Sequence, residues 1–133
     1  MKIALCFLLY FVYFCGQMEG QESATSDITG IWQQYIEWNN QWIYLSTFEV
    51  KKENGVYSMT AVHFTSDIPI IPSLGISQIR FNGKTWTFLS DWGKENGGKA
   101  FFKLNKYKPN MFLGYSYLNG RKISHNFWLR PEL

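Results

Sequence analysis

Two segments of the chain place large rings and a serine on alternate residues. The alternating residues are Trp42, Tyr44, Ser46, Phe48 and Val50 in the first segment and Trp86, Phe88, Ser90 and Trp92 in the second. Alternate side chains of a β-strand point to the same face of a sheet, so each segment presents a face of rings with a hydroxyl group. Binding sites for small molecules have this composition, because apolar walls supply affinity and a few polar groups fix orientation.

We therefore expect these faces to bind a small apolar or amphipathic molecule. The expected wall is Trp42, Tyr44, Trp86, Phe88, Trp92 and Phe102, and the expected polar contacts are Ser46, Ser90 and Asn126. One alternative is that the rings simply fill a core, since aromatic side chains bury large apolar areas. Another is a carbohydrate-binding surface, in which Trp38, Trp92 and Tyr107 stack on sugar rings.

Residues that could perform catalysis are sparse. The chain has two histidines, His63 and His125, and no motif of a serine hydrolase, zinc protease, phosphate loop or nucleotide-binding turn. The sequence does not define an arrangement that would pair any of its carboxylates for acid–base work. We expect no enzymatic activity, no metal site and no cofactor.

The charge of the chain is modest. Thirteen Lys and Arg residues against ten Asp and Glu residues give a formal net charge of +3, well short of the dense charge that drives nucleic-acid binding. The cations concentrate in the last third of the chain, at Lys94, Lys99, Lys103, Lys106, Lys108, Arg121 and Lys122. This run is interpreted either as a solvated face or as a contact for an anionic partner, such as an acidic glycan or a lipid headgroup.

The first residues have the layout of a secretory signal. Lys2 precedes an apolar run over residues 3–15 that is shorter than the roughly 20 residues of a membrane-spanning helix. The predicted organisation is a signal peptide over 1–20, a linker over 21–29 and a barrel domain over 30–133. We expect cleavage within 16–23 and a secreted or extracytoplasmic protein without disulfides, because both cysteines, Cys6 and Cys15, lie in the leader. Lipid attachment at Cys15 would instead tether it to a membrane.

Beyond residue 30, short runs of β-branched and aromatic residues alternate with turn signals. Asn-Gly pairs at 54–55, 82–83, 96–97 and 119–120 favour the positive φ angles of tight hairpin turns. The eight predicted strands span residues 31–37, 42–50, 56–64, 76–81, 85–92, 99–104, 111–118 and 121–130. The pattern predicts an all-β fold.

Close hairpins in succession favour an eight-stranded antiparallel up-and-down β-barrel, because closing the sheet removes its exposed edges. A β-sandwich is the alternative. The longest gap, over residues 65–75, contains Pro69 and Pro72, which exclude a central strand, so we expect a lid-like loop or crossover there. Insertion of this loop into a partner would make the protein an interaction or inhibitor module, which is a third class of function. The oligomeric state stays open.

Short motifs mark both ends of the predicted domain. Residues 29–32 read Thr-Gly-Ile-Trp and residues 128–130 read Trp-Leu-Arg. The first resembles the Gly-x-Trp that opens lipocalin and avidin barrels, and the second is similar to the end of avidin-type chains. This resemblance to calycin-like barrels implies that Trp32 plugs a closed end and that Arg121 or Arg130 packs over its ring. It implies no biotin site, since the residues after Trp32 differ from those of avidins.

Overall fold

Tight turns with positive φ divide the chain into hairpins, and two of the four Asn-Gly pairs form such turns. In this computed structural model, which describes residues 27–69 and 71–131, Asn54 and Asn119 have φ angles of 51° and 52°, followed by Gly55 and Gly120 at 77° and 78°. Two consecutive positive φ angles are those of a type I′ turn, whose twist matches that of the flanking strands. The predicted signal peptide, its cleavage region and Cys15 lie outside the described residues.

Eight strands and one short 3-10 turn make up the described chain. They are β1 (Gly30–Trp38), β2 (Gln41–Glu53), β3 (Val56–Phe64), β4 (Gly75–Phe81), β5 (Thr85–Asp91), η1 (Lys94–Asn96), β6 (Lys99–Lys108), β7 (Met111–Leu118) and β8 (Arg121–Leu129). The bounds predicted for β3 and β7 are confirmed. β6 runs on to Lys108 instead of ending at Leu104, because Lys106 and Lys108 still pair with β7 across an irregularity in the register.

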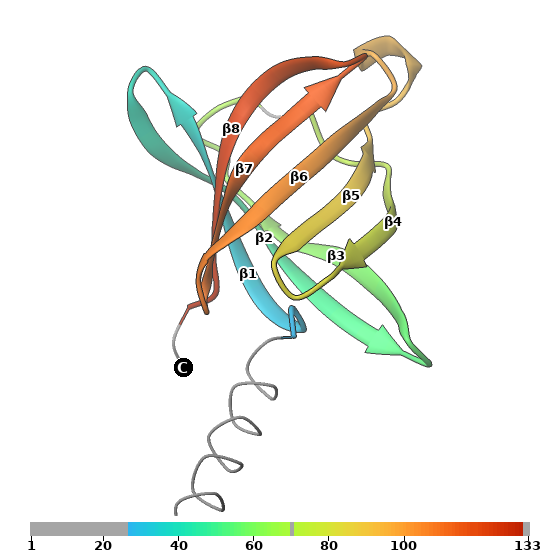
Figure 1. The fold of residues 1–133 in the computed structure, drawn as a ribbon. Helices are drawn as coiled ribbons and strands as arrows, with labels where there is room; N and C mark the ends of the chain where they lie inside the picture. Colours follow the sequence, from blue (N-terminus) through green and yellow to red (C-terminus); the bar gives the residue numbers. More distant parts are fainter. Residues whose placement is uncertain (1–26, 70, 132–133) are drawn as a thin grey trace, which may run out of the picture.

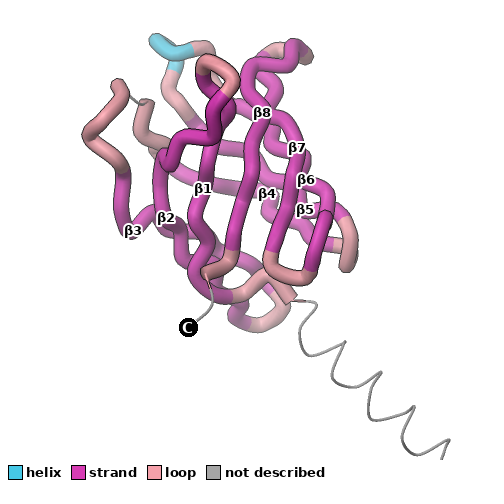
Figure 2. The backbone as a smooth tube through the Cα atoms, turned by 90° about the vertical axis from the view of Figure 1, so that its left-hand side faces the viewer, coloured by secondary structure: helices cyan, strands magenta, loops and turns pink. Residues whose placement is uncertain are grey.

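The strands form one antiparallel sheet in the order β3-β2-β1-β8-β7-β6-β5-β4. Every pair of adjacent strands except β8 and β1 is also consecutive in sequence. This confirms the predicted all-β, up-and-down fold and excludes the alternative β-sandwich. The first and last strands pair from Gln33 with Leu129 to Ile36 with Asn126. As Figures 1 and 2 show, the sheet curls into a nearly closed barrel, with β3 and β4 as its two unpaired edges.

Up-and-down connection gives the barrel two different ends. The β2–β3, β4–β5 and β6–β7 turns lie at one end with the start of β1 and the end of β8, and this is the closed end. The β1–β2, β3–β4, β5–β6 and β7–β8 connections lie at the other end, which we call the mouth and which is uppermost in Figure 1.

Aromatic rings fill the closed end. The side chains of Trp32, Trp86, Phe112 and Trp128 are at most 1% exposed. The Trp32 ring lies 5.3 Å from Trp86 and 5.4 Å from Phe112, and Trp86 lies 5.3 Å from Trp128, all at tilted or edge-to-face angles. These offset arrangements are the ones that aromatic quadrupoles favour. The cluster is therefore a packed core.

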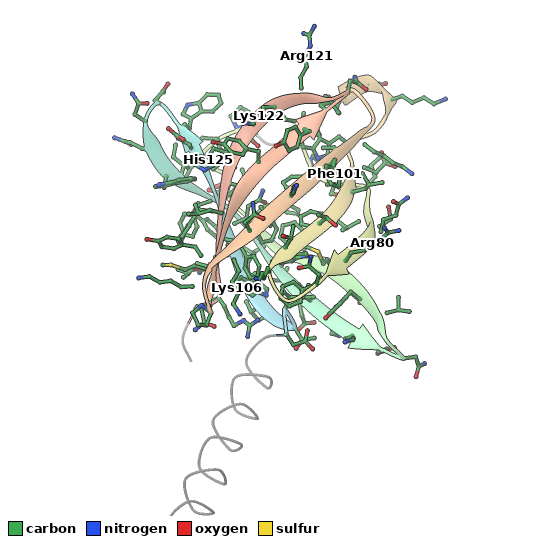
Figure 3. All side chains as sticks on the ribbon, viewed as in Figure 1. Arg80, Phe101, Lys106, Arg121, Lys122 and His125 are labelled. Carbon is green, nitrogen blue, oxygen red and sulfur yellow. The ribbon has the colours of Figure 1, made fainter. Side chains whose placement is uncertain are left out.

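Residues just before β1 and just after β8 seal this end. The Trp32 indole donates a hydrogen bond of 2.8 Å to the carbonyl oxygen of Ile28, which is itself fully buried. The Arg130 guanidinium lies 4.5 Å from the Trp32 ring centroid and donates to the carbonyl oxygen of Asp27. Of the two arginines predicted for this place, Arg130 occupies it, and Arg121 lies exposed at the mouth (Figure 3).

Asp27 also links the closed end to β3. The Tyr57 hydroxyl donates a hydrogen bond of 2.9 Å to the Asp27 carboxylate. Burial of the phenol, together with this hydrogen bond and the carboxylate charge, raises the pKa of Tyr57 to about 12. Burial likewise lowers the pKa of Arg130, against the opposing effect of the Asp27 charge. Residues 27–29, which precede the first strand, thus form part of the closed end.

Candidate ligand-binding site

Two β-bulges shape the mouth half of the barrel. In β2, Ser46 pairs with Gln34 and Tyr44 with Tyr35, so Leu45 is an extra residue. In β8, Ser124 pairs with Ser116 and Lys122 with Tyr117, so Ile123 is extra. A bulge shifts the alternation of side chains and re-aims those beside it. Both extra residues contribute to the lining of the mouth.

The β2 bulge overturns the expected placement of Trp42 and Tyr44. Both side chains lie on the outer face: Tyr44 packs 5.8 Å from Tyr35, and Trp42 packs 5.7 Å from Phe127 and is 45% exposed. Alternation from Ser46, Phe48 and Val50 predicted an inward position, which is wrong because Leu45 breaks the phase. Neither ring lines the cavities described next.

An inner pocket of about 60 Å³ lies between the aromatic core and the mouth. Phe88 and Phe102 stack 4.7 Å apart at 9° and form part of its wall. The full lining is Gln34, Leu45, Ser46, Phe48, Phe64, Ile71, Ser73, Ile76, Phe88, Ser90, Trp92, Phe102 and Trp128. Five predicted site residues meet here, namely Ser46, Phe88, Ser90, Trp92 and Phe102.

A larger cavity of about 370 Å³ opens above the inner pocket at the mouth. Its lining consists of Gln34, Ile36, Trp38, Leu45, Ile68, Pro69, Ile71, Trp92, Phe102, Ile123 and Ser124. The two spaces share Gln34, Leu45, Ile71, Trp92 and Phe102 as lining residues, so they adjoin. Among the described residues, the lining of both spaces contains no Asp, Glu, Lys, Arg or His.

A chain of buried hydrogen bonds crosses the barrel beside these cavities. The Ser46 hydroxyl donates to the side-chain oxygen Oε1 of Gln34 at 2.6 Å, and the Gln34 side-chain Nε2 donates to the side-chain oxygen Oδ1 of Asn126 at 2.8 Å. Asn126 then donates to the Ser124 hydroxyl at 3.0 Å, and Ser124 bonds to Ser116. Each member has a partner, which offsets the cost of burying polar groups. Of this chain, Gln34, Ser46 and Ser124 reach the cavity walls.

The β3–β4 connection forms one side of the mouth, where a lid-like loop or crossover was predicted. It supplies Ile68, Pro69 and Ile71 to the cavity. The loop is tied to the barrel at both ends: Thr65 N–H donates to the Leu45 carbonyl at 2.9 Å, and the Ser90 hydroxyl donates to Ser73 at 2.8 Å. The second bond joins a predicted site residue to the loop.

Other predicted residues lie elsewhere. Trp86 is fully buried in the closed-end core and Asn126 belongs to the hydrogen-bond chain, so neither lines the two cavities. Of the rings proposed for sugar stacking, Trp38 and Trp92 meet at the mouth cavity, whereas Tyr107 lies near the closed end and is 65% exposed.

The two histidines lie on the outer face on different strands. His63 Nδ1 lies 3.0 Å from the Tyr44 hydroxyl, and His125 Nδ1 lies 3.0 Å from a Glu37 carboxylate oxygen. Within residues 27–69 and 71–131, no three metal-binding side chains gather at one point. In the same part of the chain, no helix has the length and apolar character that crossing a membrane requires.

Sequence reasoning missed several lining residues. Gln34 had a readable signal, since it lies two positions after the inward-facing Trp32 on β1. Leu45 and Ile123 had none, because the bulges that place them contain no glycine or proline. Ile68 and Ile71 lie in the loop, where periodicity gives no information.

Comparisons with protein-family models, with curated proteins and with solved structures return no match to the chain.

Proposed function

We propose that this protein is an exported, non-catalytic, calycin-like barrel that binds one small uncharged amphipathic molecule at its mouth. The observation that carries the proposal is the uncharged mouth cavity of about 370 Å³ above the inner pocket. Its volume lies within the range of about 300–1,000 Å³ that is usual for small-molecule sites. The calycin-like assignment is supported by the packing of Arg130 over Trp32 at the closed end.

The make-up of the walls supports a ligand with an apolar body and one polar group. Trp38, Trp92 and Phe102, with the aliphatic residues of the mouth, offer apolar contact. Gln34 and Ser124 offer hydrogen-bonding groups at the same cavity. A polar group of the ligand that reaches these side chains exchanges its hydrogen bonds to water for hydrogen bonds to the protein. Burial of the apolar body adds roughly 0.8 kcal/mol of binding free energy for each CH₂ group.

The lack of charge in the lining argues against an ionised ligand. A carboxylate that leaves water without a cationic partner loses far more free energy than a hydroxyl group does. Ligands with a neutral head, such as alcohols, esters or amides, are therefore favoured over fatty acids at neutral pH. This distinction makes the proposal testable with two molecules of equal chain length.

The decisive experiment is a titration of the protein with 1-decanol and with decanoate at pH 8, followed by tryptophan fluorescence and by calorimetry. We expect saturable binding of decanol and at least about ten-fold weaker binding of decanoate. The difference should shrink as the pH falls through the pKa of the free acid. Absence of saturable binding by either molecule, or equal affinity at pH 8, would refute the proposal.

A matched pair of variants tests the place of binding. Leu45→Phe adds volume where the mouth cavity and inner pocket adjoin, and Leu113→Phe makes the same change on β7 outside both cavities. We expect only Leu45→Phe to weaken decanol binding. If both variants bind like the wild type, the ligand lies somewhere else.

A further inference from the structure

The barrel is divided sharply in charge. Residues 75–131 contain ten Lys and Arg against two Asp and Glu, a net charge of +8, whereas residues 27–74 contain two against five, a net charge of −3. The small net charge of the whole chain hides this division. Strands β4 to β8 therefore carry a strong positive potential that the rest of the barrel lacks.

Many of these cations point outward from neighbouring strands. In β6, Lys99, Phe101 and Lys103 are exposed and alternate with buried residues. Pairing aligns Lys103 with Tyr115 of β7, and through Thr87 of β5 with Arg80 of β4. Figure 3 shows Arg80 and Phe101 on the side of the barrel formed by β4 to β8, with Lys122 nearer the mouth.

Aromatic rings lie between the cations. Phe101 is 40% exposed and packs 6.3 Å from Tyr117, which is opposite it on β7. Tyr115 is 36% exposed, but its ring is stacked 4.6 Å from His125 and has the Lys122 ammonium 4.1 Å from its centroid. We call this surface the basic aromatic face; its main residues are Arg80, Lys99, Phe101, Lys103, Tyr115 and Lys122.

Two carboxylates near this face contact groups other than its lysines. The Asp91 carboxylate, next to Lys99 in the β5–β6 pair, accepts a hydrogen bond of 2.9 Å from the Gly93 N–H. Glu37, beyond Tyr115, is paired with His125. The outward cations of β6 thus have no salt-bridge partner among the described residues.

We propose that the basic aromatic face binds an acidic polysaccharide. Its lysines and Arg80 would pair with carboxylate or sulfate groups, and the exposed Phe101 ring would stack on the C–H face of a sugar. The outer side of a narrow barrel is convex, so a flat bilayer touches it along a narrow strip, whereas a flexible polymer follows the curve. This surface is separate from the mouth cavity, and the inference does not depend on the proposed small ligand.

The probes are polygalacturonate and heparin, with uncharged dextran as control, measured by affinity electrophoresis and calorimetry over a range of salt concentrations. We expect both polyanions to bind with an affinity that falls as salt rises, through screening and release of counterions. Dextran should not bind. An affinity for the polyanions that does not change with salt, or the absence of binding, would overturn the proposal.

Two charge reversals of equal size locate the surface. Lys99→Glu with Lys103→Glu changes β6, and Lys51→Glu with Lys52→Glu makes the same change in net charge on exposed residues of β2. We expect the β6 pair to lower affinity about ten-fold or more and to flatten the salt dependence, because each lost cation removes about one unit of slope. Equal losses from both pairs would mean that net charge alone drives binding.

Removal of a ring separates stacking from charge. Phe101→Ala should weaken binding about two- to ten-fold at every salt concentration without changing the slope, and Val56→Ala, an exposed apolar residue at the other end, should change nothing. Tighter binding to vesicles of anionic lipid or to single-stranded oligothymidylate than to the polysaccharides would assign the face to those partners and reject the proposal. Decanol binding in the same variants shows independently whether the mouth still works.

Discussion

The two ends of the barrel use the same kinds of side chain for different purposes. At the closed end, Trp32, Trp86 and Trp128 pack at tilted or edge-to-face angles and seal the interior. At the mouth, Trp38 and Trp92 line open space above the stacked pair of Phe88 and Phe102. Abundant rings therefore do not identify a binding site. The difference lies in the backbone, because bulges and a long loop widen the mouth.

Hydrogen bonding follows the same division. The chain from Ser46 through Gln34 and Asn126 to Ser116 lies on the mouth side of the tryptophan cluster. A polar layer between core and cavity is tolerated because its members satisfy one another. It also gives the cavity polar wall groups without a charge. Stability should thus depend chiefly on the closed end and ligand affinity on the mouth.

The largest contrast is expected between two tryptophans. Trp32→Ala removes a fully buried ring and should lower the free energy of unfolding by about 3–5 kcal/mol. Trp38→Ala, at a side chain that is 55% exposed, should cost less than about 0.5 kcal/mol and instead weaken decanol binding. Urea unfolding and the decanol titration measure the two effects. Similar losses of stability would end the comparison.

The hydrogen-bond chain should show the next largest effect. Asn126→Leu leaves the Gln34 side-chain NH₂ group without its acceptor and removes one of the two hydrogen bonds of the Ser124 hydroxyl, and should cost about 1–3 kcal/mol in unfolding free energy. When Gln34→Leu is introduced into the Asn126→Leu variant, it should lower the free energy of unfolding by less than it does in the wild type, because the two residues act as a unit. A double-mutant cycle by urea unfolding tests this. Strict additivity would show that the two amides are not coupled.

The two arginines provide a smaller contrast. Arg130→Met removes the cation over Trp32 and the bond to Asp27, and should cost about 1–2 kcal/mol. Arg121→Met, at the exposed β7–β8 turn, should leave the unfolding free energy within about 0.5 kcal/mol of the wild type. Thermal unfolding of both variants gives the comparison, and it fails if Arg121→Met is the more damaging.

The smallest effect concerns alkaline pH. The pKa of Tyr57 is about 12 in the folded protein against 10.0 for the free side chain, so folding favours the protonated phenol. This contribution is complete below pH 10 and is lost as the pH rises through 12. Tyr57→Phe should therefore lose less stability than the wild type over that interval, as followed by denaturant unfolding at several pH values. Parallel losses would place the shift elsewhere.

Sequence patterns predicted most of the fold but only part of the candidate site. The bounds of β3 and β7 could be predicted from the alternation of their side chains and from the turns on either side of them. Alternation fails at Leu45, because the neighbouring apolar residues fit either phase and nothing local marks a bulge. Trp42 and Tyr44 were misplaced for that reason. Loop side chains such as Ile71 join the site only through tertiary packing, which no periodicity reports.

The pairing of β1 with β8 also has a kinetic consequence. Arg130 reaches back to Asp27 across 103 positions, and Gln33 pairs with Leu129. Contacts so distant in sequence form slowly, since the entropy of closing the loop is lost before the contact forms. During synthesis the hairpins can assemble one by one, but the barrel closes only when its last strand has emerged. Until then the ring-rich inner face stands open to solvent, and the chain depends on its final residues to conceal it.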